Sequence, residues 1–169
     1  TRKCAEFWKK TLEVEVIEVS TCEAAELVKL ANNQWIDLNI ALANELAILC
    51  DSLPYDLDVL EIIQGANSLK KGQHYVNILT PSIGVGGYCL TKDPLLASWS
   101  RKTFFDSESE LKMSINSVSV NDQMPVFAFE RLVQVFGSLA GKNITFLGVS
   151  YRGDVGDTRF TPVDTLVSL

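Results

Sequence analysis

The sequence has little of what metal sites and disulfide frameworks require. Its 169 residues include one histidine, His74, and four cysteines, none close enough to another to form a CxxC pair. We therefore expect no metal site, and a chain of this length and apolar content does not need disulfides to fold. These cysteines fit a reducing cytoplasm, where each is either a buried packing residue or a reactive thiol.

Basic residues and long apolar runs are also scarce. The chain has 15 Lys and Arg against 21 Asp and Glu, which gives a net charge of -6. This balance predicts neither nucleic-acid binding nor attachment to an anionic membrane, and no apolar run approaches the roughly 18 residues of a membrane span. A few well-placed cations can still bind an anionic small molecule. Because the chain begins without methionine and ends within an apolar pattern, we expect a piece of a longer protein.

What remains is a pattern that predicts a mostly α-helical chain. Residues 1–10 are expected to be the end of a helix in which Phe7 and Trp8 pack, and residues 12–19 alternate like a half-buried strand. A long helix is predicted over 22–51, which has no Gly or Pro and is rich in Ala, Leu and Glu. Its apolar residues lie on nearly all sides of the helix, so we expect it to pack against another subunit or domain as well as against its neighbours in this chain.

The rest of the chain predicts further helices and one strand. Asp93-Pro94 offers a capping residue followed by a proline in the first turn, and Pro125 is expected to kink or break the helix that contains it. The predicted elements are helices at 56–66, 93–101 and 108–139, a buried parallel strand at 143–150, and a final helix opening at 161–164. The last two look like the start of a second, α/β domain.

A first polar cluster lies on the predicted long helix. Lys29 and Asn33 are four residues apart and share a face, and Asn44 falls on nearly the same side. The simplest explanation is that Lys29 extends to water while the asparagines bond backbone at a helix crossing. The alternative is a functional lysine–asparagine pair.

A second cluster surrounds Cys89 in the Gly-rich run Gly84–Pro94 (GVGGYCLTKDP). Gly86 and Gly87 allow the backbone to bend and to approach a ligand closely. Positive charge from Lys92 and from a helix N-terminus favours the thiolate that a nucleophilic cysteine needs. The alternative is a Gly-rich turn around a buried, inert thiol. The other cysteines lack these neighbours and are expected to be packing residues: Cys4, Cys22 and Cys50.

A third cluster, Tyr151–Arg159 (YRGDVGDTR), lies between the last predicted strand and helix. Ligands bind α/β folds at such loops, and Arg152 and Arg159 could hold phosphates through paired hydrogen bonds. The alternative is a solvated loop in which Asp154 and Asp157 neutralise the two arginines.

Taken together, the clusters resemble the nucleotide-sugar 6-dehydrogenases, the family of UDP-glucose and GDP-mannose dehydrogenases. Three blocks match in order: Ala25–Leu30 (AELVKL) continuing through Asn33 to Asn44-Glu45, the cysteine block Gly84–Pro94, and Gly148 through Arg159 to Pro162. The lead-in at 76–81 (VNILTP) is similar to members that act on UDP-N-acetylhexosamines.

The resemblance implies NAD-dependent oxidation of the C6 alcohol of a nucleotide sugar to a carboxylate, with a UDP-sugar as the expected substrate. Cys89 would attack the C6 aldehyde, giving a thiohemiacetal and then a thioester that water hydrolyses. Lys29 would stabilise the oxyanion, Asn33 would hold the reacting oxygen or water, and Asp93 would orient or deprotonate that water.

Binding roles also follow from the resemblance. Gly86, Gly87, Lys92 and Arg152 would contact the nucleotide sugar, and Arg159 the cofactor or a domain interface. A homodimer would form through the long helix. The implied organisation is the end of an NAD-binding domain (1–20), a helical central domain (21–140) and the start of a nucleotide-sugar-binding domain (141–169).

Three features depart from the family pattern. Arg152 stands where many members have lysine, and Gln73-His74-Tyr75 lacks an arginine that reaches a neighbouring subunit's substrate. The N-terminal NAD-binding domain and most of the third domain of the family are also missing, and the cysteine block is not a GxGxxG dinucleotide fingerprint, so this chain by itself is expected neither to bind NAD well nor to be active.

Two rival interpretations remain at this point. A β-hydroxyacid-type dehydrogenase also uses a lysine and an asparagine one helical turn apart, but it needs no nucleophile such as Cys89. A non-catalytic assembly module would use the long helix only as a dimer interface.

Overall fold

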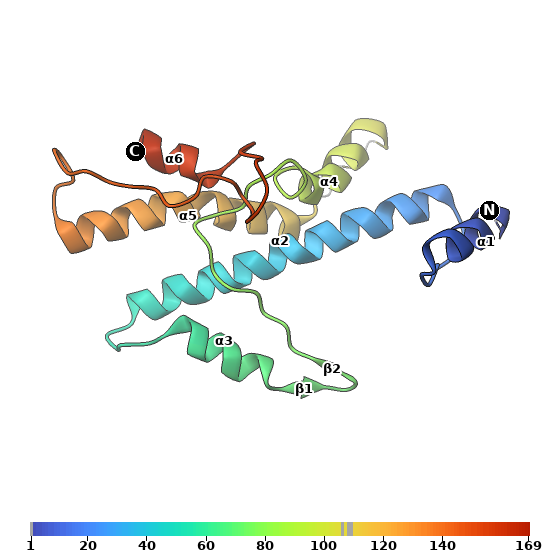
Figure 1. Ribbon diagram of the computed structural model, residues 1–169, viewed down its shortest axis with the longest axis horizontal. Coiled ribbons are helices and arrows are strands. Elements are labelled where there is room, and N and C mark those ends of the chain that lie inside the picture. The colour runs from blue at the N-terminus through green and yellow to red at the C-terminus, as the bar shows by residue number, and fades with distance from the viewer. Residues whose placement is uncertain (1, 106, 108–109) are drawn as a thin grey trace.

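Two long helices form the centre of the molecule. The computed structural model describes residues 2–105, 107 and 110–169. α2 (Cys22–Ser52) and α5 (Lys112–Phe136) lie side by side and run in the same direction, from the Gln34–Ser114 hydrogen bond to the Asp51–Arg131 ion pair (Figure 1). The remaining described residues add four shorter helices and one two-stranded hairpin, so the predicted mostly α-helical class is confirmed.

α2 matches the predicted helix almost residue for residue. Thr21 is its N-cap and accepts a hydrogen bond from the Ala24 amide at 3.1 Å. Its buried residues are small or polar: Asn33, Asp37, Ala41, Ala43, Asn44 and Cys50. Several of its large apolar side chains are exposed instead, so neighbours within this chain cover only part of its surface.

The interface between α2 and α5 is polar where most helix interfaces are apolar. Ser117 donates to Asp37 Oδ2 at 2.6 Å, and the Asn121 side-chain amide donates to Asp37 Oδ1 at 2.8 Å. The amide of Asn44 in turn donates to Asn121 Oδ1 at 2.9 Å. All four side chains are buried, and these bonds fix the register of the two helices.

The segment between α2 and the cysteine block is more ordered than a simple loop. α3 (Val59–Asn67) starts three residues later than predicted, because Asp58 accepts from the Leu60 amide and caps the helix. Beyond it, β1 (Lys70–Lys71) pairs with β2 (His74–Tyr75) in a short antiparallel hairpin that the sequence did not predict.

α4 (Asp93–Phe104) and α5 differ from the prediction at their ends. Lys92 is the N-cap position of α4, and the Asp93 side chain turns away to bond other side chains instead of capping the helix. For α5, the predicted start at 108–109 lies outside the described residues, and the helix begins at Lys112. Pro125 lies inside α5 and does not break it.

Both predicted strands are absent. Residues 13–19 connect α1 (Arg2–Leu12) to α2 without forming a strand, and residues 143–150 likewise connect α5 to α6 (Pro162–Ser168). A strand needs a neighbour for its backbone hydrogen bonds, and the described residues supply none at either place. Leu147, expected in a buried strand, is 96% exposed.

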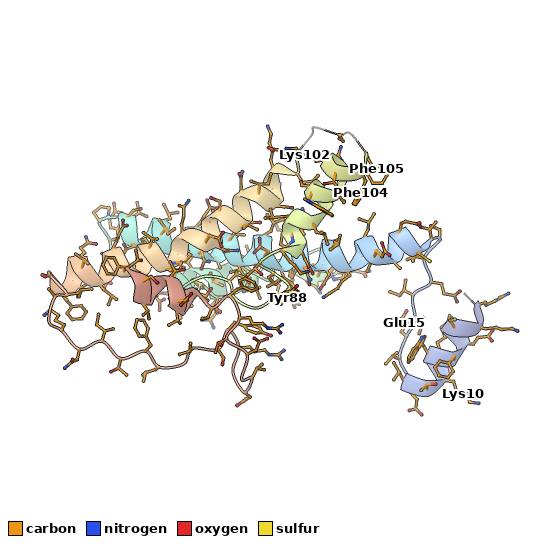
Figure 2. All side chains as sticks on the ribbon, turned by 90° about the horizontal axis from the view of Figure 1, so that it is seen from above. Lys10, Glu15, Tyr88, Lys102, Phe104 and Phe105 are labelled. Atoms are coloured by element: carbon orange, nitrogen blue, oxygen red, sulfur yellow. The ribbon has the colours of Figure 1, made fainter. Side chains whose placement is uncertain are left out.

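α1 lies beyond the N-terminal end of α2, apart from the other helices (Figures 1 and 2). Phe7 and Trp8 contact each other edge to face at 5.1 Å but are about half exposed, so the prediction that they pack is not met within the described chain. The predicted final helix is confirmed as α6, with Thr161 as its cap.

Candidate functional site

A chain of polar contacts joins the N-terminal half of α2 to the start of α4. The Lys29 ammonium donates to Asn33 Oδ1 at 2.9 Å, and the Asn33 amide donates to Asp93 Oδ2 at 2.6 Å. Lys92 pairs with the other oxygen of Asp93. Lys29 therefore does not simply extend to water. It lies on the same helical face as Asn33, as predicted, and through Asn33 it is connected to Asp93 of α4.

The charges in this chain stabilise one another. Burial of Asp93 disfavours its charged form, but hydrogen bonds from Lys92 and Asn33, together with the charges of Lys92 and Lys29, outweigh burial and lower the pKa of Asp93. The pKa of Lys92 is raised, mainly by its hydrogen bond to Asp93. Both groups are consequently ionised at neutral pH, and Asp93 is a buried carboxylate held in its charged form.

Cys89 lies in the turn that leads into α4. Its carbonyl accepts hydrogen bonds from the Lys92 and Asp93 amides at 3.1 and 2.9 Å, and its thiol is exposed. The alternative of a buried thiol is therefore wrong. Among the other cysteines, Cys50 is buried as predicted, whereas Cys4 and Cys22 are exposed because they lie in α1 and in the first turn of α2, outside the packed region.

Gly86 and Gly87 allow another group to approach the backbone closely, as predicted. Within this chain that group is the segment containing Tyr151 and Phe160, not a ligand. A side chain at Gly86 would lie 2.8 Å from Tyr151 Cβ and 3.0 Å from the Phe160 carbonyl oxygen. Gly87 has a φ of 86° and faces the Tyr151 ring, and its amide donates to the Arg159 carbonyl at 2.9 Å. The third sequence cluster thus packs directly on the cysteine loop.

Two cationic side chains contact the ring of Tyr88, the residue before Cys89. The Lys92 ammonium lies 5.2 Å and the Arg159 guanidinium 5.3 Å from the centre of the Tyr88 ring. Phe160 lies 6.1 Å from the same ring, and Figure 2 shows Tyr88 beside the 150–160 segment. Tyr88 was not singled out in the sequence, although its position between the glycines and Cys89 was a usable signal.

The two arginines of the third cluster have different surroundings. Arg159 forms paired hydrogen bonds with Asp157, including one of 2.7 Å, and this contact lowers the pKa of Asp157 to about 2. Arg152 is exposed and lines a shallow hollow formed by residues 147–155. Within this chain, Arg159 joins the cysteine loop and Arg152 does not share its contacts.

Known proteins are similar to this chain in sequence. The model for the UDP-glucose/GDP-mannose dehydrogenase family, central domain, matches residues 23–123. The UDP-N-acetyl-D-mannosamine dehydrogenase of Campylobacter jejuni is 36% identical over 174 aligned positions, which cover 100% of this chain and 40% of that protein. The enzyme of the same name from Methanocaldococcus jannaschii is also 36% identical, over 98% of this chain and 36% of its own.

The chain belongs to the UDP-glucose/GDP-mannose dehydrogenase family.

Solved members of the family share its fold. The UDP-D-ManNAc dehydrogenase of Pyrococcus horikoshii superposes with a TM-score of 0.76 at 34% identity, over 98% of this chain and 38% of that one. This family chain therefore spans about two fifths of the length of the curated relatives it matches. Within its described residues, no helix is long and apolar enough to cross a bilayer, and no group of three or more His, Cys, Asp or Glu side chains is placed to hold a metal.

Proposed function

We propose that the protein carrying this chain oxidises the C6 alcohol of a UDP-N-acetylhexosamine to the carboxylate, using Cys89 as its nucleophile. The observation that carries the proposal is the continuous contact chain from Lys29 through Asn33 to Asp93, which reaches the turn that holds Cys89. The substrate class rests on relatives named as UDP-N-acetyl-D-mannosamine dehydrogenases.

Each residue of the contact chain has a task in this scheme. The Cys89 thiolate adds to the C6 aldehyde, and the Lys29 ammonium stabilises the resulting oxyanion. Loss of hydride from that carbon leaves a thioester on Cys89. Asp93, held ionised and hydrogen-bonded to Asn33, orients the water that hydrolyses the thioester by accepting a hydrogen bond from it, and the proton of that water passes to the departing Cys89 thiolate.

NAD⁺ would accept both hydrides, because conversion of an alcohol to an acid is a four-electron oxidation. One cation beside the cysteine loop fits its anionic part, because the Arg159 guanidinium lies 5.3 Å from the centre of the Tyr88 ring. We assign Arg159 to this contact, Lys92 to the substrate side, and Arg152 and the glycine loop to the nucleotide sugar. Residues 1–20 would end an NAD-binding domain, 21–140 form the central domain and 141–169 begin the sugar-nucleotide domain.

We also propose a homodimer through α2. Four of its exposed apolar residues are spaced seven apart and so form one stripe along the helix: Val28, Trp35, Leu42 and Leu49, which are 45 to 58% exposed. Such a stripe fits a second copy of the same helix. The free thiols of the chain fit a reducing compartment, for which we propose the cytoplasm.

The thiol at position 89 provides the test. Alkylation by iodoacetamide, followed by peptide mass spectrometry, compares Cys89 with the exposed Cys4 in the same molecule. We expect Cys89 to react about tenfold faster at pH 7, because only a favoured thiolate is strongly nucleophilic. Cys89→Ser should also abolish NAD-dependent oxidation in the intact protein.

Equal alkylation of the two thiols, with oxidation unaffected in Cys89→Ser, would contradict the proposal. The chain would then be part of an enzyme that uses no nucleophilic cysteine, or a module that acts only in subunit assembly.

A further inference from the structure

The segment leading to the cysteine loop, residues 77–82, forms no strand and has no backbone hydrogen-bond partner among the described residues. The Val76 amide just before it still donates to the Leu69 carbonyl at 3.1 Å, beside the β1–β2 hairpin. Three asparagine side chains form hydrogen bonds with backbone groups of residues 77–82: Asn39 and Asn44 from α2, and Asn67 from the last turn of α3.

Two of the asparagines bind the segment through both ends of the side-chain amide. Asn67 accepts from the Ile78 amide at 2.7 Å and donates to the Ile78 carbonyl at 2.9 Å. Asn39 accepts from the Leu79 amide at 2.9 Å and donates to the Asn77 carbonyl at 2.6 Å. A primary amide has the donor and acceptor of a peptide group, so these side chains replace the missing neighbouring strand.

Asn44 connects the end of the segment to the buried polar interface. Its Oδ1 accepts from the Ser82 amide at 2.8 Å, while its side-chain amide donates to Asn121. Ser82 then donates through its hydroxyl to the Gly84 carbonyl at 2.9 Å. The bonds thus continue up to the first glycine of the cysteine loop.

The same helix carries the polar residues of the candidate site. Lys29 and Asn33 extend from α2 toward Asp93, and Asn39 and Asn44 extend from α2 toward residues 77–82. A shift of the segment relative to α2 would therefore shift the cysteine loop relative to Lys29. Five hydrogen bonds between the side chains of Asn39, Asn44 and Asn67 and backbone groups of the segment oppose such a shift.

We propose that Asn39, Asn44 and Asn67 are positioning residues for Cys89, holding residues 77–82 so that the cysteine loop meets α2 beside Lys29 and Asn33. This inference rests on the proposed nucleophilic role of Cys89. The asparagines act through the backbone and touch no reacting atom.

The test uses Asn39→Ala and Asn67→Ala, because both residues are only partly buried and their loss leaves the α2–α5 interface intact. Amide hydrogen exchange is expected to accelerate about fivefold or more at Leu79 in the first variant and at Ile78 in the second, as each loses its acceptor. Alkylation of Cys89 is expected to slow about fivefold relative to Cys4, because a loosened loop no longer holds the thiol at the α4 N-terminus.

Two controls separate positioning from general stability. Ile63→Ala removes a buried side chain of α3 and should lower the melting temperature without slowing Cys89 alkylation. Asn39→Asp keeps the acceptor for the Leu79 amide and should restore slow exchange at Leu79 together with most of the thiol reactivity.

The outcomes distinguish the two proposals. If Cys89 in the unaltered chain reacts no faster than Cys4, the nucleophile itself is refuted and this inference falls with it. If Cys89 reacts fast in the unaltered chain and equally fast in both alanine variants, the nucleophile stands and the positioning role is wrong. Unchanged exchange at Ile78 and Leu79 would likewise overturn it.

Discussion

At the scale of single residues, Asp37 is a carboxylate buried between two helices without a cationic partner among the hydrogen bonds and ion pairs of the described residues. It is 1% exposed and is held by the neutral donors Ser117 and Asn121. Burial raises its pKa, although the hydrogen bonds from Ser117 and Asn121 act in the opposite direction. Because the folded pKa exceeds the unfolded one, the folded protein binds the proton more tightly, and stability falls as pH rises through that range.

We expect Asp37→Asn to raise the free energy of unfolding at pH 7 by about 1 kcal/mol. An asparagine keeps the acceptor for Asn121, and Ser117 can accept from its amide, so no bond need be lost. The difference should disappear at pH values below the unfolded pKa of the aspartate, where Asp37 is protonated in both states. Urea unfolding at several pH values measures this.

The exposed Asp56 provides the control, since Asp56→Asn should change little at any pH. A less stable Asp37→Asn variant at pH 7 would show that the charge itself stabilises the interface.

The residues that sequence could identify are those whose neighbours are close along the chain. Lys29 and Asn33 share a helical face, and Cys89 lies four residues before Asp93, so helix periodicity and a motif suffice to find them. Asn39, in contrast, bonds to backbone groups 38 and 40 positions away. Asn67 bonds to a backbone group 11 positions away. No periodicity reports such contacts, and these residues were missed.

At the scale of elements, the connection from α5 to α6 matters most for the site. Its residues 151–160 pack on the cysteine loop through Tyr151, the Phe160 carbonyl and the Gly87–Arg159 backbone bond. This packing is possible only because Gly86 has no side chain.

We expect Gly86→Ala to separate these two segments. The added Cβ would lie 2.8 Å from Tyr151 Cβ and 3.0 Å from the Phe160 carbonyl oxygen, and neither is the flexible end of a side chain. The variant should lose about 1–3 kcal/mol of stability, and the Gly87 amide should exchange faster with solvent. Hydrogen exchange followed by NMR would measure both effects.

Gly153→Ala is the matched control, because nothing lies within 4 Å of a Cβ at that position. Equal behaviour of the two variants would mean that the segments do not touch in solution.

Elements with local signals were predicted well and those that need distant partners were not. α2 is defined by its cap and by the absence of helix breakers, and α6 by Thr161-Pro162. The apolar run at 143–150 has the composition of a buried strand, but strand formation depends on a neighbouring strand. Composition alone could not reveal that the described residues provide none.

At the scale of the whole molecule, the exposed surface is too large for a self-contained domain. The chain exposes 12572 Å² at 18.7 kDa, whereas a compact monomer of this mass exposes about 8,300 Å². The excess includes the stripe of α2 residues spaced seven apart, which supports the proposed pairing of two copies.

We expect Leu42→Glu to prevent dimer formation, because a charge in the middle of an apolar helix interface loses its hydration without gaining a partner. Light scattering coupled to size exclusion should report about one chain mass instead of two. Val135→Glu, at a 63% exposed position of α5, is the control and should remain dimeric. A dimeric Leu42→Glu variant would place the interface elsewhere.

The side-by-side packing of α2 and α5 has a consequence for synthesis on the ribosome. The Asp37–Ser117 and Asp37–Asn121 contacts join residues 80 and 84 positions apart. At about 5–20 residues per second, the partner of α2 emerges roughly 4 to 16 seconds after α2 itself. During that interval the nascent helix exposes the polar face that later packs on α5 together with its stripe of apolar residues, so we expect early chaperone binding to matter for this segment.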